Sequence, residues 1–183
     1  MSNPFEIVLL ELADAFERER IGYMVIGGLA VGVWGVQRLT KDADIAVAID
    51  PNDAGELLET LAPQIDWILP NAAELAVETG IIRFRHRSRI AVDLGVSLNP
   101  YLVGAIERAV DVDVAGRPVK FCSAEDLILH KLLADRDQDR IDIKGIIRRQ
   151  KKDLDRKQLD VLVRQLAEAT TRPEILRRYL DYF

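Results

Sequence analysis

Short apolar runs alternate with glycine and charged turns over the first part of the chain. Apolar residues recur at three- and four-residue spacing over residues 4–20, which predicts an amphipathic helix. Asn3 can cap its first turn, Pro4 suits the first helical position, and Gly22 can end it. The apolar run Tyr23–Ile26 follows directly and predicts a buried strand.

The middle of the chain predicts further strands mixed with helices. Helices are expected at Leu29–Trp34, Asp53–Leu61 and Pro100–Arg108, and strands at Asp44–Ile49, Ile81–Arg87, Arg89–Val96, Asp111–Ala115 and Pro118–Phe121. The two strands around Ser88 predict an antiparallel hairpin. The last two strands suit a second hairpin, in which Pro118 indicates an edge strand. Residues 63–79 are ambiguous, although Trp67–Leu69 suits a short strand.

From Ser123 onward the pattern is helical throughout. Ser123 and Asp126 resemble a capping box that opens a helix to about Asp135. Further helices are expected at residues 139–150, 155–169 and 172–182. We therefore predict an α/β (α+β) fold with a mixed, twisted sheet flanked by helices. Residues 1–122 would form this core, and residues 123–183 a helical C-terminal segment packed on it.

Composition narrows the class of protein. About half of the 183 residues are apolar, and the net charge is −5. This charge does not favour general nucleic-acid binding, although local patches can still bind. No apolar run approaches the roughly 20 residues of a spanning helix, and the N-terminus lacks a basic leader. A single cysteine, Cys122, suits a reducing compartment. We expect a cytoplasmic protein without a membrane segment.

Three aspartates share one sequence pattern on two predicted strands. Asp42 and Asp44 are spaced by one residue, so they point to the same side of a strand that begins by Asp42. Asp93 lies on the strand Arg89–Val96, flanked on its face by small residues. If the two strands are neighbours, three carboxylates converge, and hard oxygen ligands suit Mg²⁺. A lone strand aspartate can equally be a turn or cap residue.

Gly27 and Gly28 stand between a predicted strand and a predicted helix. Glycine lets the backbone approach a ligand, and a helix N-terminus offers N–H groups to a phosphate. The alternative is a tight turn without a ligand. A second candidate is basic: Arg83, Arg85 and Arg87 alternate along one strand. A solvated sheet face explains them best, and a track for a triphosphate or an RNA end is the alternative.

The stretch VIGGLAVGVWGVQRLTKDADI resembles the signature of the DNA-polymerase-β-type nucleotidyltransferase superfamily, in which a glycine turn and helix precede a strand with Asp-x-Asp. The form with Arg38, Thr40, Asp42 and Asp44 is most similar to the AbiEii-type branch, which includes toxins of type IV toxin–antitoxin systems. The downstream stretch SAEDLILHKLLADRDQDRIDIKGII is similar to a helical motif of that branch. The resemblance therefore implies the nucleotidyltransferase fold.

The resemblance also implies an activity. A nucleoside monophosphate would pass from an NTP to an acceptor hydroxyl on RNA, a protein or a small molecule, with Mg²⁺ or Mn²⁺ as cofactor and an antitoxin as a further partner. The implied metal ligands are Asp42, Asp44 and Asp93, and the implied triphosphate contacts are Gly27, Gly28, Arg38, Thr40 and Lys131. Lys131 and Asp142 would line the opposite wall of the site. The alternative from another class is a non-catalytic interaction module with the same fold.

Several of these residues have a structural explanation as well. Lys131 could form an exposed helical ion pair with Asp135, four residues on. Asp142 could serve the dipole of its helix, and Asp139 suits the cap of the same helix. The two histidines, His86 and His130, are isolated and are expected to be structural, as is Cys122 as a buried apolar residue.

Overall fold

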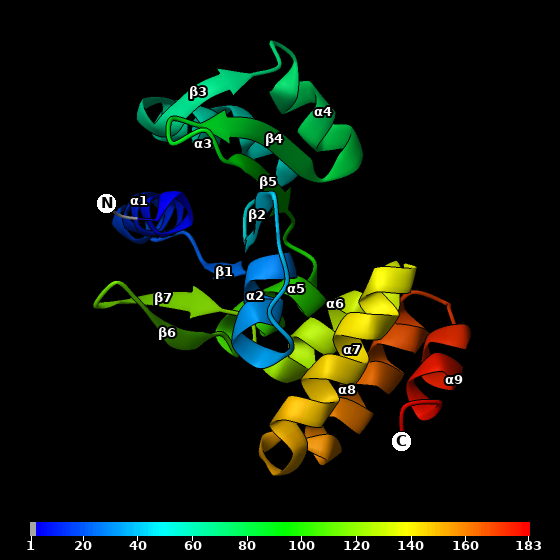
Figure 1. Cartoon of the computed structure of the whole chain (residues 1–183). Helices are drawn as coiled ribbons and strands as arrows, with labels where there is room; N and C mark the ends of the chain where they lie inside the picture. Colours follow the sequence, from blue (N-terminus) through cyan, green and yellow to red (C-terminus); the bar gives the residue numbers. More distant parts are fainter. Residues whose placement is uncertain (1–2) are drawn as a thin grey trace. The chain divides into compact units, whose positions relative to one another are not determined.

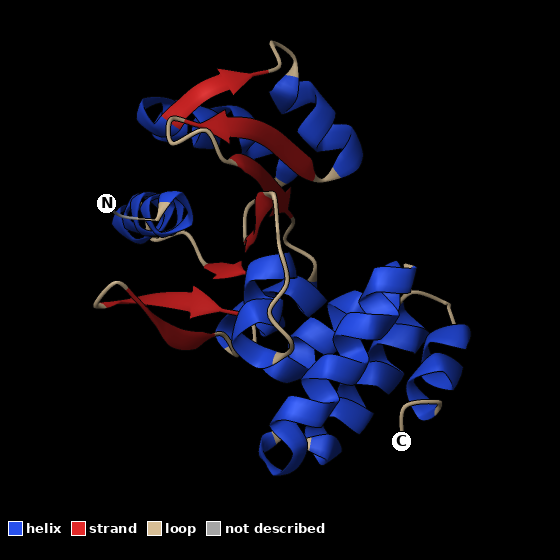
Figure 2. Ribbon diagram, viewed as in Figure 1, coloured by secondary structure: helices blue, strands red, loops and turns tan. Residues whose placement is uncertain are grey.

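The computed structural model describes residues 3–183 (Figure 1). The helices are α1 (Pro4–Arg18), α2 (Gly27–Trp34), α3 (Ala54–Leu61), α4 (Ala72–Thr79), α5 (Pro100–Glu107), α6 (Ala124–Ala134), α7 (Asp137–Gln150), α8 (Arg156–Ala169) and α9 (Glu174–Leu180). The strands are β1 (Tyr23–Val25), β2 (Asp42–Val47), β3 (Ile65–Ile68), β4 (Ile81–His86), β5 (Ala91–Val96), β6 (Val110–Val114) and β7 (Arg117–Phe121). Figure 2 shows the helices and strands in separate colours.

Seven strands form one sheet in the order β3-β4-β5-β2-β1-β7-β6. The pairs β2–β5 and β1–β7 are parallel, and the other neighbours are antiparallel. Helix α1 contacts β2, β6 and β7, α4 contacts β4, and α5 contacts β2. The mixed sheet flanked by helices confirms the predicted α/β (α+β) fold.

One face of the central strands supplies the core. Every second side chain of β4 and β5 is buried, so their sequences alternate between core and outer face. Strand β2 follows the same alternation from Asp42 to Ile45, and its last two residues are both buried. The core side includes Ala43, Ile45, Ile82, Phe84, Val92 and Leu94. Helix α1 adds Val8, Leu12 and Phe16, each fully buried. Its start is fixed as predicted, because the Asn3 side chain accepts a hydrogen bond from the backbone N–H of Phe5.

The chain divides into two compact units. The first comprises the residues up to Leu29 and Leu39–Cys122, and the second comprises Ala30–Arg38 and Ser123–Phe183. Within the second unit, α6 contacts α7, α8 and α9. The core of this unit includes Leu127, Ile128, Leu129 and Leu132 of α6, which are all buried. The expectation that residues 123–183 pack on the sheet domain stays a prediction.

Four local features differ from the prediction. Helix α2 begins at Gly27 rather than Leu29, and β2 begins at Asp42 rather than Asp44. The ambiguous stretch contains α4, which ends at Gly80 in the left-handed conformation (φ 69°). Pro118 does not lie on an edge strand, because β7 stands between β1 and β6.

The position of Pro118 has a simple physical reason. Strand β7 pairs with the short strand β1 through Phe121 and Val25, three residues beyond the proline. Among the described strands, Pro118 pairs only with Asp113 of β6. The missing N–H therefore interrupts no ladder with β1. No helix within residues 3–183 is long and apolar enough to cross a membrane.

Candidate active site

Asp42 and Asp44 lie on one face of β2. Both are half-buried, and Ala43 and Ile45 on the opposite face are fully buried. The hydroxyl of Thr40 donates a hydrogen bond to Oδ1 of Asp42 at 3.1 Å. Strand pairing and core packing therefore hold the two carboxylates on the outer face of the sheet. This arrangement matches the expectation from their spacing.

Asp93 lies beside Asp44 on the neighbouring strand. Strands β2 and β5 are parallel, and their register pairs Asp44 with Asp93 and Asp42 with Ala91. Side chains at paired positions share a face, so Asp93 joins the carboxylate face of β2. Arg83 is paired with Asp93 across β4 and β5, and its Nε donates to Oδ2 of Asp93 at 3.1 Å. A row of three charged side chains therefore crosses the sheet: Arg83, Asp93 and Asp44.

The backbone of Gly27 packs closely against one of these carboxylates. Its φ is +63°, in the left-handed region that favours glycine. A Cβ placed on Gly27 would lie 1.8 Å from Oδ2 of Asp44. The N–H of the preceding residue, Ile26, donates to the carbonyl of Asp44 at 2.9 Å. Because α2 begins at Gly27, the N-terminus of this helix lies against the Asp44 side chain.

The carboxylates fit a hard divalent cation held partly by a substrate. Within residues 3–183 no group of three His, Cys, Asp or Glu side chains is placed to hold a metal ion. Mg²⁺, however, usually takes one or two protein carboxylates and completes its shell with water and substrate phosphates. Asp42 and Asp44 supply such a pair, whereas Asp93 is engaged by Arg83. Asp93 as a third metal ligand stays a prediction.

The other two predicted site residues form a separate cluster in the helical unit. Lys131 of α6 contacts Asp139 and Asp142 of α7, with Nζ to oxygen distances of 2.8 and 2.9 Å. All three side chains are at most 5% exposed. The alternative, an ion pair of Lys131 with Asp135, is wrong, because Asp135 pairs with Arg140 and Arg178 instead.

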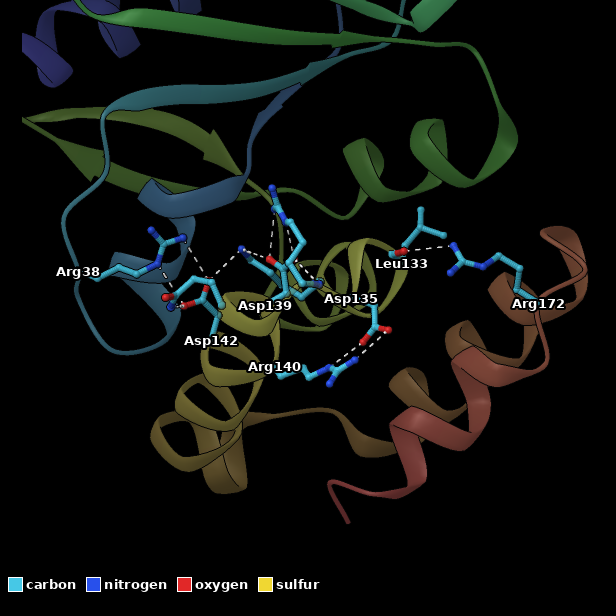
Figure 3. Close-up of polar contacts among 10 residues, drawn as sticks. Arg38, Leu133, Asp135, Asp139, Arg140, Asp142 and Arg172 are labelled. Carbon is cyan, nitrogen blue, oxygen red and sulfur yellow. Dashed lines mark hydrogen bonds and ion pairs between the residues drawn. The ribbon is translucent and has the colours of Figure 1, made fainter.

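Arg38 completes this cluster. Its Nε and Nη2 donate to the two carboxylate oxygens of Asp142, each at 3.2 Å, and Gln138 donates to Oδ1 at 2.8 Å. Figure 3 shows Arg38 facing Asp142, with Asp139 beside them. Burial alone would raise the pKa of Asp142, but the hydrogen bonds from Arg38, Gln138 and Lys131 outweigh it and hold this pKa below its usual value. Asp142 is thus an ionised, fully paired buried carboxylate.

Asp139 helps to cap α7, as expected, although it does so from the third helical position and not as the N-cap residue. It lies at the third position of α7, where its carboxylate accepts from the backbone N–H and the Nε of Arg136. Burial raises its pKa, but the hydrogen bonds from Arg136 and Lys131 outweigh burial, so that the pKa of Asp139 lies below its usual value. Sequence reasoning missed this residue as the partner of Lys131. The available signal was the three-residue spacing from Asp142, which places both acids on one helix face.

The end of α2 is fixed to α7 within the helical unit. Nη1 of Arg149 donates to the carbonyl of Gly35 at 2.7 Å, and Nε2 of Gln150 donates to the carbonyl of Trp34 at 2.7 Å. Gly35 packs so closely that a Cβ there would meet Cγ1 of Ile146 at 3.0 Å. These contacts satisfy carbonyls left free at a helix C-terminus. They hold the segment that ends at Arg38 beside Asp142.

The three alternating arginines do not form one track. Arg83 bonds Asp93, Arg85 bonds Asp66 at 2.7 Å, and Arg87 bonds Glu11 at 2.8 Å. Strand β4 ends at His86, so Arg87 lies beyond it. Only Arg83 is therefore tied to a candidate site residue. His86 and Cys122 are fully buried, in line with the structural roles expected of them.

The sequence and the fold both match known proteins. The model of a family described as "Nucleotidyltransferase of unknown function (DUF6036)" matches residues 7–178. No protein with a curated description matches the chain.

Solved structures share the fold at low identity. A nucleotidyltransferase-like antigenic protein from Paracoccidioides brasiliensis is 17% identical with a TM-score of 0.55, covering 94% of this chain and 92% of its own. The lincosamide adenylyltransferase LnuA is 18% identical with a TM-score of 0.51, covering 79% of this chain and 96% of its own. ANT(2")-Ia, solved with adenylyl-2"-tobramycin, is 16% identical with a TM-score of 0.58, covering 97% and 99%. The fold agrees with the family match, and the chain belongs to the DUF6036 family of nucleotidyltransferases.

Proposed function

We propose that this chain transfers a nucleoside monophosphate from an NTP to an acceptor hydroxyl and releases pyrophosphate. Family membership supports this class of reaction. Two proteins with the same fold are described as an adenylyltransferase and as a complex with an adenylylated product. The single observation that carries the proposal is the approach of Gly27 to the carboxylate of Asp44, beside Asp93. The absence of a side chain at Gly27 brings the N-terminus of α2, which favours a phosphate, next to the carboxylates that would hold its metal ion.

The proposed transfer is a displacement at phosphorus. The acceptor oxygen forms a bond to the α-phosphorus of the NTP. The bond from that phosphorus to the oxygen that bridges to the β-phosphate breaks, and pyrophosphate leaves with the electron pair. Asp93 takes the acceptor proton on a carboxylate oxygen, and Arg83 orients that carboxylate. Backbone N–H groups of Gly27 and Gly28 bind the triphosphate, where the helix dipole also favours negative charge.

Asp42 and Asp44 would hold Mg²⁺ or Mn²⁺. A bound ion would supply positive charge for the phosphate oxygens and a template for their orientation. Thr40 fixes the Asp42 carboxylate through its hydroxyl. Asp93 completes the acidic face next to Asp44.

The resemblance also predicts Arg38 as a triphosphate contact. Its side chain is 32% exposed, whereas those of Lys131 and Asp142 are 5% and 3% exposed. We therefore assign Lys131 and Asp142 to positioning: they hold the guanidinium of Arg38 in one orientation.

The resemblance to AbiEii-type toxins adds finer predictions. It predicts a toxin with an antitoxin partner and leaves RNA, protein and small molecules as acceptors. A neighbouring antitoxin-like reading frame would support the toxin role. The alternative is a non-catalytic interaction module, and a binding experiment distinguishes it from an enzyme.

Thermal melting with each of the four NTPs, with and without Mg²⁺, tests the proposal. Ligand binding to the native state alone raises the melting temperature by mass action. We expect a metal-dependent rise for at least one NTP in the wild type and a smaller rise in Asp44→Asn. The absence of any metal-dependent rise in the wild type favours the interaction module.

A further inference from the structure

A cavity of about 320 Å³ lies in the sheet unit next to the carboxylate face. Its walls come from α4, the turn before it and β4. The lining residues are Leu69, Ala72, Leu75, Thr79, Ile81 and Arg83. The volume falls within the roughly 300–1,000 Å³ of small-molecule sites. A small ligand could therefore bind in this partly open cavity.

The cavity is apolar except at one end. Four of the lining side chains are hydrocarbon, and two of them, Leu69 and Ile81, are 41% and 37% exposed. The hydroxyl of Thr79 already donates to the carbonyl of Leu75 at 2.7 Å. Arg83 is thus the lining residue with polar atoms to offer, and its side chain is 69% exposed. No carboxylate lines the cavity among its described residues.

Arg83 connects this cavity to the proposed site of transfer. The same guanidinium that lines the cavity donates through Nε to Oδ2 of Asp93 at 3.1 Å. Asp93 in turn pairs with Asp44 in the β2–β5 register. Ile81, on the same face, is opposite Gly95, where an added Cβ would meet no atom closer than 3.9 Å. A ligand in the cavity can therefore extend past Arg83 and over Gly95, which has no side chain, to reach Asp93.

We propose that this cavity is the acceptor site, and that the acceptor is a small hydroxyl compound with an apolar body that is neutral or anionic. This inference rests on the proposed transfer reaction. The apolar walls favour a hydrocarbon or aromatic body. The guanidinium of Arg83 binds a hydroxyl or an anionic group beside Asp93 and repels cationic groups. A polycation would meet a positive charge and no carboxylate within the cavity, so it is disfavoured.

Dye binding tests the cavity without any need for catalysis. Anilinonaphthalene sulfonate (ANS) is anionic, and phenylnaphthylamine (NPN) has the same aromatic body without the sulfonate. Leu75→Trp fills the cavity, and Val77→Trp places the same side chain on the exposed side of α4, where residue 77 is 51% exposed. Arg83→Gln removes the charge with little change in size. Melting temperatures establish that each variant is folded.

We expect the wild type and Val77→Trp to bind ANS equally, and Leu75→Trp to bind it roughly tenfold more weakly, because less apolar surface is left to bury. Arg83→Gln should weaken ANS but leave NPN unchanged. Equal ANS binding by the wild type, Leu75→Trp and Val77→Trp overturns the inference, as does a wild type that binds neither dye. Equal losses of ANS and NPN in Arg83→Gln contradict the assigned role of Arg83.

Transfer of label from α-phosphate-labelled NTP then separates the acceptor classes. The panel contains octyl glucoside, hydroxyphenylacetate, a polycationic aminosugar, RNA and protein. We expect label in the first two, with kcat/KM reduced in Leu75→Trp and unchanged in Val77→Trp. Label only in the aminosugar, RNA or protein overturns the acceptor assignment but leaves the transfer reaction standing. No label in any acceptor, together with no Mg²⁺-dependent stabilisation by NTP, overturns both proposals.

Discussion

Asp44 and Asp93 lie at paired positions of the parallel strands β2 and β5, and Gly27 closes on Asp44 from the start of α2. These strands are separated by more than forty residues in the chain, yet the register places both acids on one face. Two close carboxylates repel one another unless a cation or proton lies near them. Arg83 supplies a cation for Asp93. We therefore assign the face of Asp42 and Asp44 to a metal-bound triphosphate.

Gly27→Ala should disturb this site by changing the backbone position next to Asp44. The new Cβ would overlap the Asp44 carboxylate, and the left-handed φ of +63° adds strain. We expect a loss of about 1–3 kcal/mol in the free energy of unfolding and a loss of Mg²⁺-dependent stabilisation by NTP. Urea denaturation and thermal melting with NTP measure the two effects.

Gly32→Ala is the matched control in the same helix. No atom lies within 4 Å of a Cβ built there. Alanine in a helix interior is favoured over glycine by about 0.5–1 kcal/mol, so this variant should be at least as stable as the wild type and should keep its response to NTP. Similar behaviour of the two alanine variants would argue against a special role for Gly27.

Lys131→Met should destabilise the helical unit strongly. It leaves the buried carboxylates of Asp139 and Asp142 without their shared cation. Loss of one partner from a buried ion pair costs about 3–5 kcal/mol. Lys144→Met on the exposed side of α7 should change stability little. Urea denaturation of both variants checks this, and equal stabilities would contradict the structural role of the cluster.

The same cluster predicts a pH dependence. The pKa values of Asp139 and Asp142 are lowered in the native state, so both carboxylates contribute stability above the ordinary aspartate pKa of about 4. That contribution is lost as the pH falls through the lower native values. Compared with the wild type, Asp142→Asn should be less stable at pH 6, and the difference should shrink toward pH 3. A constant difference between urea titrations at the two pH values would contradict this assignment.

The sequence predicts the elements well where one face of each is buried. The alternation in Asp42–Ile45 and Ala91–Val96 follows from one core face and one outer face, so the aspartates could be placed before any coordinates. The exact start of α2 could not be predicted, because Gly27 enters the helix through a left-handed φ that only tertiary packing against Asp44 explains. Helix α4 could not be predicted either, because the spacing of its apolar residues does not distinguish a helix from a loop.

The ion-pair partners of the buried charged residues could not be predicted from the sequence either. Helix α6 ends at Ala134, and its C-cap residue Asp135 has the left-handed conformation (φ 51°). This turn brings α7 back against Lys131. Local spacing suggested Asp135 as the partner, but the turn directs Asp135 to Arg140 and Arg178 and places Asp139 and Asp142 at Lys131. Side-chain pairing between helices depends on the geometry of the connection, which a residue pattern does not contain.

The most direct test of the central claim is transfer of label from α-phosphate-labelled NTP by three proteins: the wild type, Asp44→Asn and Asp111→Asn. Asp111 is an exposed carboxylate on the edge strand β6, where it pairs with Lys120. We expect Asp111→Asn to match the wild type and Asp44→Asn to lose transfer by roughly 100-fold or more, as for the removal of other groups that stabilise transition-state charge. Wild-type transfer by a folded Asp44→Asn variant would contradict the account.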